Sequence, residues 1–172
     1  QVASTIDGRM QEWGHIDNVI NAAGLLIKSP LEQQSPADVA QQVSVNLLGS
    51  LNVAQCSHAA LKASHGMLLQ FSSSSFTRGR ADYSAYSACK AAIVNLTQAL
   101  SDEWKDDGIR VNCVVPGRTD TSMRRANFSG EDQRTLLSPY EVALASAKLR
   151  RPASRDFSIS SSFERCFSTI RL

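Results

Sequence analysis

The middle of the chain contains a tyrosine and a lysine whose spacing suits acid–base chemistry. They lie in the segment Tyr86-Ser87-Ala88-Cys89-Lys90. Four positions apart, they share one face of a helix. A phenol, with a pKa of about 10, is a poor acid–base group at neutral pH. A neighbouring ammonium group favours the phenolate and brings the phenol pKa toward the working pH. Because chance and surface pairing also produce this spacing, the pair needs support from its surroundings.

That support comes from polar residues that follow apolar stretches. Ser73 lies thirteen residues before Tyr86, in the serine cluster that closes the apolar run 66–71, and its hydroxyl could hold a substrate oxygen beside the tyrosine. It belongs to a run of four serines, so Ser72 and Ser74 stay open as alternatives. Asn46 lies on an otherwise apolar helix face, where it is either a functional group or a satisfied core amide.

The apolar pattern along the chain alternates between strands and helices. Short, nearly continuous apolar runs predict buried parallel strands, and helices with apolar residues at helical spacing lie between them. The fold class is α/β, a Rossmann-like doubly wound parallel sheet with flanking helices. The predicted strands are 16–20, 66–71 and 108–115, and the predicted helices are 2–13, 35–62, 83–104 and 138–149.

Ligands of such sheets bind beyond the carboxyl ends of the strands. The residues to inspect therefore follow each strand: 21–24, 72–75 and 116–121. Asn21 to Gly24 is a turn of small residues that lets a ligand approach the backbone closely, or it is a turn and nothing more. Tyr83 is expected to be a pocket or packing aromatic.

Six motifs in order resemble the short-chain dehydrogenase/reductase family. They are NAAG at 21–24, NxxG at 46–49, the serine at 73, YSACK at 86–90, GIRVN at 108–112 and PGRTDT at 116–121. The resemblance covers residues 1–149. It implies an NAD(P)-dependent oxidoreductase that reduces a carbonyl or oxidises an alcohol of a small molecule by hydride transfer.

The resemblance also implies a role for each motif residue. Tyr86 is the general acid or base, Lys90 lowers the Tyr86 pKa and binds the nicotinamide ribose, and Ser73 orients the substrate carbonyl. Asn46 holds a water of a proton relay. The cofactor, NADP as first candidate and NAD as the other, is expected to contact Asn21, Ala22, Gly24, Tyr86, Lys90, Pro116, Gly117, Thr119 and Thr121.

The family's glycine-rich turn, usually TGxxxGIG, does not occur in the 172 residues. The expected fold is therefore incomplete, with the first strands and the glycine-rich loop absent, and an isolated chain of this kind is expected to bind dinucleotide weakly. The alternative function is a non-catalytic chain that acts through the surface of helices 35–62 and 83–104, which in many family members form homodimers or homotetramers.

Residues 150–172 differ from the body in composition. They are rich in serine and arginine, and five arginines there oppose Asp156 and Glu164. We expect a poorly ordered tail without a strand, or with a short helix near 163–167. The remaining body has no excess of positive charge, so nucleic acid is not an expected partner.

Composition narrows the remaining classes. The four cysteines form no CxxC pair, so the sequence predicts neither a metal site nor a disulfide framework and favours the reducing cytoplasm. Cys89 is expected to be a packing residue. His15, His58 and His65 are expected to have surface or packing roles. No stretch is apolar enough to cross a bilayer, so a membrane is not an expected partner.

The segment after Pro116-Gly117 resembles reductase modules fused to cytidylyltransferases. Those modules reduce a pentulose phosphate, so the resemblance implies a sugar or pentulose phosphate as substrate. Arg124 and Arg125 would then face an anionic substrate. The alternative is that both arginines belong to a solvated helix start.

Overall fold

Three parallel strands form the centre of the protein, as the sequence predicts. The computed structural model describes residues 1–149 and 167–170, and its parallel strands are β1 (Asn18–Asn21), β2 (Met67–Phe71) and β3 (Arg110–Pro116). β2 pairs with both others, so that Leu68 is opposite Val19 and Val111. Because β2 is covered on both faces, its residues from Met67 to Gln70 are all buried.

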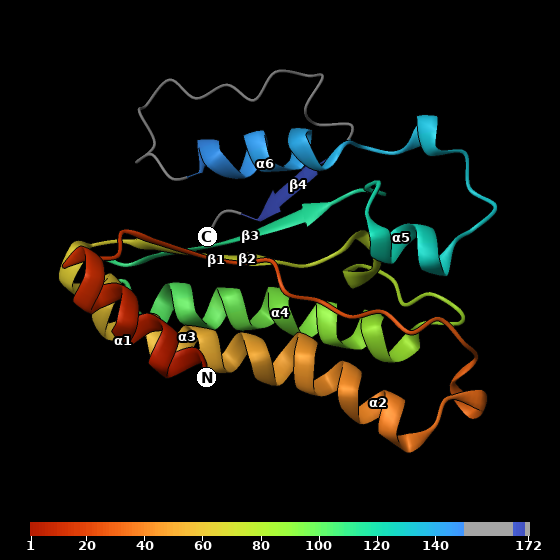
Figure 1. Cartoon of the computed structure of the whole chain (residues 1–172), viewed down its shortest axis with the longest axis horizontal. Helices are drawn as coiled ribbons and strands as arrows, with labels where there is room; N and C mark the ends of the chain where they lie inside the picture. Colours follow the sequence, from red (N-terminus) through yellow and green to blue (C-terminus); the bar gives the residue numbers. More distant parts are fainter. Residues whose placement is uncertain (150–166, 171–172) are drawn as a thin grey trace.

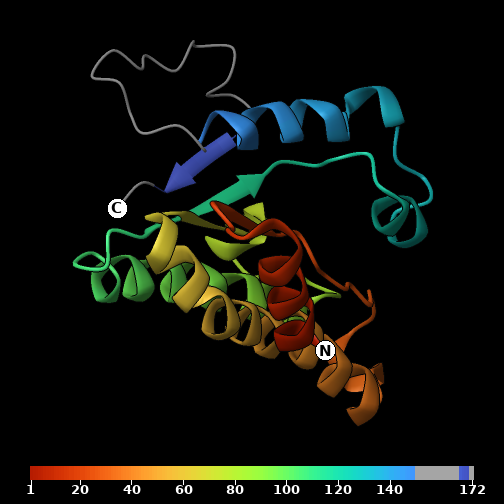
Figure 2. The same ribbon diagram turned by 60° about the vertical axis from the view of Figure 1, so that its left-hand side comes forward.

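Helices cover the two faces of this sheet, which makes the fold Rossmann-like (Figures 1 and 2). α1, α2, α3 and α4 lie on one side of the strands and α6 lies on the other. The helices are α1 (Val2–Trp13), α2 (Pro36–Val43), α3 (Gly49–Ser64), α4 (Ser84–Glu103), α5 (Ser122–Asn127) and α6 (Pro139–Lys148). No helix within residues 1–149 is long and apolar enough to span a bilayer.

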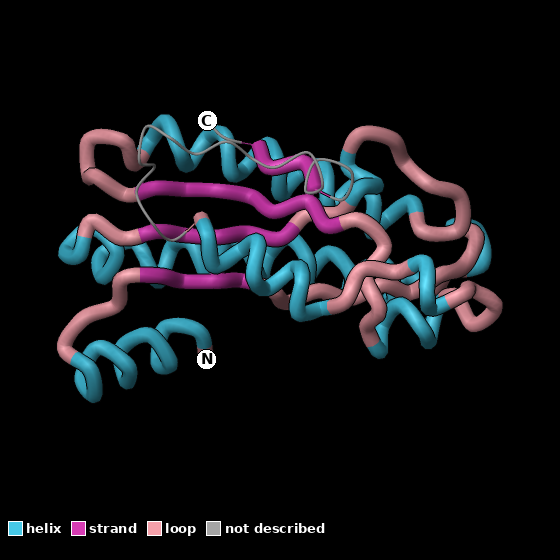
Figure 3. The backbone as a smooth tube through the Cα atoms, turned by 90° about the horizontal axis from the view of Figure 1, so that it is seen from above, coloured by secondary structure: helices cyan, strands magenta, loops and turns pink. Residues whose placement is uncertain are grey.

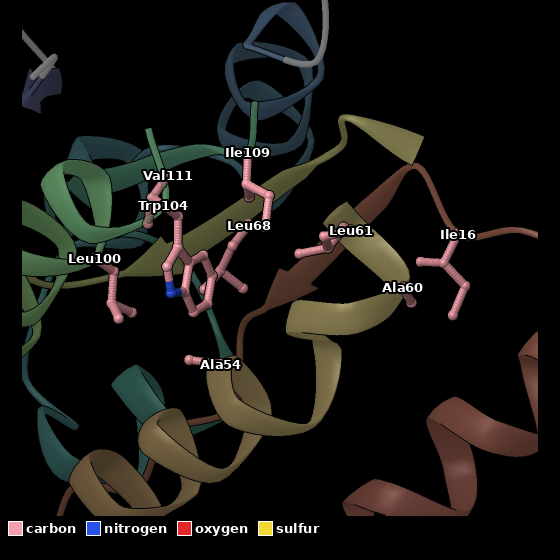
Figure 4. Close-up of a cluster of buried hydrophobic side chains, with 9 residues drawn as sticks. All are labelled: Ile16, Ala54, Ala60, Leu61, Leu68, Leu100, Trp104, Ile109 and Val111. Atoms are coloured by element: carbon pink, nitrogen blue, oxygen red, sulfur yellow. The ribbon is translucent and has the colours of Figure 1, made fainter. Parts of the chain in front are cut away.

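The larger core lies between the sheet and helices α1, α3 and α4. Leu61, Leu68 and Trp104 belong to its buried cluster, which Figure 4 draws in full. Along β2 the side chains alternate, so Leu68 faces this cluster whereas Met67 and Leu69 pack with Val114 in a separate cluster. Burying both faces of one strand orders the sheet that carries the site.

The predicted helix 35–62 is present but contains an unexpected π-helical turn. Ser35 caps the start by accepting a hydrogen bond from the amide of Asp38, as its position predicts. Between α2 and α3, residues Ser44–Leu48 are wound as a π-helix. Here the side chain of Asn46 donates to the carbonyl of Gln42 (2.8 Å), a side-chain bond of the kind that disturbs regular winding.

A fourth strand corrects the prediction for the end of the chain. β4 (Phe167–Ile170) pairs antiparallel with β3, with Ile170 opposite Cys113 (Figure 3). The expectation of no strand in 150–172 is therefore wrong for these residues. The open edge of β3 offers unpaired backbone groups, and a four-residue segment with Phe, Thr and Ile has the β propensity to use them. The expected poor order and helix fall on 150–166, outside the described residues.

Gly66 makes the closest backbone approach at the junction between α3 and β2. α3 ends at His65 in the left-handed conformation (φ 48°), and the chain turns at once into β2. A Cβ on Gly66 would lie 2.5 Å from the carbonyl oxygen of Asp17. Since that oxygen belongs to the backbone ahead of β1, nothing there can move aside cheaply.

Replacing Gly66 by alanine is therefore expected to destabilise the protein by about 1–3 kcal/mol, the usual cost of forcing atoms into a packed site. Gly8→Ala, in the interior of α1 where nothing lies within 4 Å of the added atom, is the matched control. It is expected to stabilise by about 0.5–1 kcal/mol. Urea unfolding of both variants tests this, and equal effects would contradict the close approach.

Candidate active site

A cavity of about 300 Å³ opens at the carboxyl ends of the three parallel strands. Figure 1 shows this end of the sheet beside α5. Its walls come from the segments that follow β1, β2 and β3, as predicted, and from α4, α5 and α6. The predicted site residues that line it are Ala22, Gly24, Ser73, Tyr86, Lys90, Pro116, Gly117, Thr119 and Thr121.

Ser73 is the serine that contacts Tyr86. The Ser73 hydroxyl lies within reach of the Tyr86 phenol and favours its ionised form. Ser72, the neighbouring alternative, instead donates its hydroxyl to the carbonyl of Lys90 (2.6 Å). Ser74, the other alternative, is exposed on the short 3-10 turn that follows. All four serines of the run line the cavity, and Ser73 is the one whose hydroxyl acts on the Tyr86 phenol, so its catalytic role stays a prediction.

Lys90 reaches the floor of the cavity from α4. Its side chain is buried, and Nζ donates to the carbonyl of Phe71 at 2.9 Å. Nζ lies 5.5 Å from the centroid of the Tyr86 ring. A Cβ on Gly24 would come within 3.5 Å of Nζ, so a glycine at 24 leaves the space above the lysine open. Burial lowers the Lys90 pKa to about 8.

Burial also dominates the acidity of Tyr86, against our expectation. The Tyr86 pKa is raised because burial disfavours the phenolate, while the Ser73 hydrogen bond and the charge of Arg124 act in the opposite direction more weakly. We expected Lys90 to lower this pKa. In the structure the Lys90 ammonium is bonded to Phe71, and burial of the phenol prevails. Tyr86 is therefore protonated at neutral pH and able to act as an acid.

Asn21 and Asn46 do not line the cavity but hold the turn that does. The Asn21 side chain donates to Gln70 (2.9 Å) and Ser50 (3.0 Å) and accepts from the amide of Ala23. The Asn46 side chain accepts from the amide of Leu25 (3.1 Å) and donates to its carbonyl (2.7 Å). Both amides are therefore paired within the protein, as in the core-amide alternative for Asn46, and they fix the segment that carries Gly24.

Part of the far wall of the cavity was not predicted from the sequence. α5, the residue directly after it and α6 fold back over the strand ends, and they contribute Met123, Phe128, Pro139 and Val142. Tyr83, expected as a pocket or packing aromatic, lines the cavity and makes an edge contact with Phe128 (5.9 Å between centroids). No local pattern in this polar stretch predicts which side chains return to the site.

The two candidate arginines separate in the structure. Arg124 lines the cavity, whereas Arg125 is not among the lining residues and pairs with Asp120 on the exposed side of α5. Arg125 therefore fits the solvated alternative, whereas Arg124 is in a position to face a ligand, and the anionic nature of that ligand stays a prediction.

His58 has an acidic partner that its sequence neighbourhood does not reveal. Its Nε2 lies 2.7 Å from Asp107, which also pairs with Lys62, and its ring packs on Trp104. The cluster ties α3 to the end of α4. The prediction of a packing role is confirmed.

The chain belongs to the short chain dehydrogenase family, whose model matches residues 1–132. It is 45% identical over 131 residues to the bifunctional ribulose 5-phosphate reductase/CDP-ribitol pyrophosphorylase of Haemophilus influenzae. That match covers 76% of this chain and 28% of the relative.

Solved structures agree with this assignment. The fold matches the oxidoreductase yciK of Escherichia coli with a TM-score of 0.82 and 31% identity, over 91% of this chain and 65% of that one. A short chain dehydrogenase of Escherichia coli CFT073, solved with NADPH, also gives a TM-score of 0.82 and 31% identity, over 90% and 65%. The chain thus spans less than two thirds of each of these relatives.

Burying Lys90 carries a cost that depends on pH. An unfolded lysine keeps its proton up to about pH 10.5, whereas folded Lys90 loses it near pH 8. Between these values the unfolded state binds more protons, so stability rises with pH. The cost is fully present below pH 8.

Lys90→Met removes this cost and loses one hydrogen bond to Phe71. At pH 7 we expect the variant to be more stable by about 1–3 kcal/mol, and the gain should shrink as pH rises from 8 to 10.5. Denaturant melts at several pH values measure it. Lys105→Met, on an exposed side chain, is the control and should change little. A gain of Lys90→Met that did not depend on pH would contradict the buried charge as its cause.

Proposed function

We propose that this chain is the catalytic part of an NADP(H)-dependent oxidoreductase that interconverts a carbonyl and an alcohol. The observation that carries the proposal is the arrangement of Ser73, Tyr86 and Lys90 around one cavity at the strand ends. A bound nicotinamide dinucleotide would supply the hydride for this reaction.

The residues present fit the nicotinamide end of such a cofactor. Gly24 leaves space over the Lys90 ammonium that a Cβ would fill, and that ammonium can donate to ribose hydroxyls. Pro116, Gly117 and Thr119 would border the nicotinamide ring. NADP is the preferred form because related structures, including the one from Escherichia coli CFT073, were solved with NADP or NADPH.

The protein's own groups would then manage the proton and the substrate. Tyr86, protonated at neutral pH, would donate its proton to the carbonyl oxygen during reduction. The Ser73 hydroxyl, which lies beside Tyr86 in the cavity wall, would hold the same oxygen. Lys90 would stabilise the tyrosinate left after the transfer, since an opposite charge lowers the cost of ionisation.

We propose a pentulose phosphate as the substrate class. The relative of Haemophilus influenzae is named as a ribulose 5-phosphate reductase and shares 45% identity over 131 residues. The lining supports this proposal, because serine and threonine hydroxyls together with Tyr83 and Tyr86 could hydrogen-bond a small polar molecule.

A second candidate function is association through the helices, without catalysis. Leu48, at the end of the π-helical turn, and Leu51, in α3, are 50% and 41% exposed, and both lie on the helix 35–62 that is expected to form dimers. Size-exclusion chromatography with an NADPH titration separates the candidates, because a dimer that does not respond to NADPH favours association alone.

Tyr86→Phe tests the catalytic proposal. Removing the phenol hydroxyl is expected to lower the turnover of ribulose 5-phosphate with NADPH by about 10²–10⁴-fold, the usual contribution of a positioned acid. The affinity for NADPH, measured by fluorescence titration, should stay within a few fold, since the ring remains.

Tyr140→Phe is the matched control, because Tyr140 is 71% exposed on α6 and is not a lining residue. It should leave both turnover and binding unchanged. If the wild-type chain, shown to be folded, neither binds NADPH nor turns over the substrate, the catalytic residues are inherited and unused.

A further inference from the structure

The charged side chains among the described residues of the cavity wall are all cationic. Among the described residues that line the cavity, Lys90, Arg118 and Arg124 are cationic and none is acidic. Lys90 is placed beside Tyr86, at the reacting end. The two arginines come from the segment after β3, so they form a separate group whose purpose the acid–base chemistry does not explain.

Arg124 is held rigidly at the wall. Its Nε and Nη2 donate to the two carboxylate oxygens of Glu131 at 2.7 and 2.8 Å. Its guanidinium carbon lies 3.7 Å from the centroid of the Phe128 ring, a cation–π stack, and the Lys28 ammonium lies 4.9 Å from the same centroid. Only 21% of the Arg124 side chain is exposed, so the planar group is oriented before any ligand arrives.

Arg118 converges on the same carboxylate. Its Nη1 donates to Oε1 of Glu131 at 2.9 Å. One carboxylate therefore holds two guanidinium groups, and the trio keeps a net positive charge. Each guanidinium has about five N–H donors, so three bonds to Glu131 leave donors on both arginines for a further anion.

The neighbouring residue Arg125 forms an ion pair with Asp120 that has a structural role only. It forms two hydrogen bonds to Asp120, one arginine to one carboxylate, and it is not a lining residue. Its charge is matched and directed away from the cavity. The difference between Arg124 and Arg125 is thus the excess of cation over anion and the position at the wall.

We propose that Arg118 and Arg124 form the site that binds the phosphate group of the substrate, with Glu131 as the positioning residue. This rests on the proposed function, and it assigns the specificity for a phosphorylated substrate to these two arginines. A phosphate monoester carries a charge of about −1.5 to −2 and can accept from both guanidinium groups at once. The site would fix the distal end of a keto sugar phosphate while Ser73 and Tyr86 hold its carbonyl.

The test compares Arg124→Gln and Arg118→Gln with Arg125→Gln as the matched control. KM is measured for ribulose 5-phosphate and for ribulose, and the Kd of inorganic phosphate is measured by calorimetry at low ionic strength. We expect Arg124→Gln and Arg118→Gln to raise the KM for the phosphorylated sugar and the Kd for phosphate roughly 10- to 100-fold, as for a lost charge-assisted hydrogen bond. The KM for ribulose and the Kd of NADPH should stay within about twofold.

Glu131→Gln is expected to change phosphate binding less than Arg124→Gln, because the arginines lose their shared anchor while the loss of the carboxylate raises the net positive charge of the trio. A cooperative thermal transition is required of every variant. Arg118→Gln keeps the proposal testable if Arg124→Gln does not fold, since Arg118 is 56% exposed and has fewer packing contacts.

Two results would overturn the proposal. One is an equal effect of Arg125→Gln, which would reduce the site to general surface charge. The other is a loss of NADPH affinity in Arg124→Gln with unchanged discrimination between ribulose and its phosphate, which would assign the arginines to the cofactor. If no carbonyl is reduced but phosphate still binds through Arg124, the proposed function fails and the anion site remains.

Discussion

The pairing of β2 with both of its neighbours is the constraint on which the site depends. Parallel strands in register end at one edge of the sheet, so residues far apart in sequence, such as Gly24, Ser73 and Gly117, arrive at one place. Of the three parallel strands, only β2 has four consecutive buried residues, Met67 to Gln70. The hydrophobic burial of this strand therefore supplies the rigidity that the polar residues beyond it require.

At that edge of the sheet, the burial of ionisable groups determines the protonation states of Tyr86 and Lys90. Burial keeps Tyr86 protonated and lowers the pKa of Lys90 to about 8. Burying these polar groups costs free energy, because water solvates an ammonium and a phenol better than the protein interior does. Nothing in the hydrophobic core needs a lysine at this position. A group that costs stability and lies in a cavity beside an acid is the pattern expected of a functional site.

Much of the fold and of the candidate site could be predicted from the sequence, because the signals for these features lie within short segments of the chain. The apolar runs that became β1, β2 and β3, the cap at Ser35 and the Tyr86–Lys90 spacing are all visible within a few residues. What could not be predicted depends on contacts across the fold. Tertiary packing brings Phe128 back to the cavity and pairs His58 with Asp107. It also decides which serine of the cluster lies beside Tyr86. The strand at Phe167–Ile170 is a similar case, because its β propensity matters only beside the open edge of β3.

The π-helical turn between α2 and α3 allows one continuous helix to contact both the loop after β1 and the hydrophobic core. Gln42, before the turn, and Asn46, within it, bond to the backbone of the loop after β1. After the turn, Ala54 and Leu61 face the core. In a regular α-helix each residue advances the face by about 100°, so one fixed rotation would have to satisfy both contacts. A wider turn changes the angular offset between the two halves and lets each take the phase that its own partner requires. The deletion of a single residue within Ser44–Leu48 would therefore act as a twist of one half against the other, felt in the core and in the loop alike.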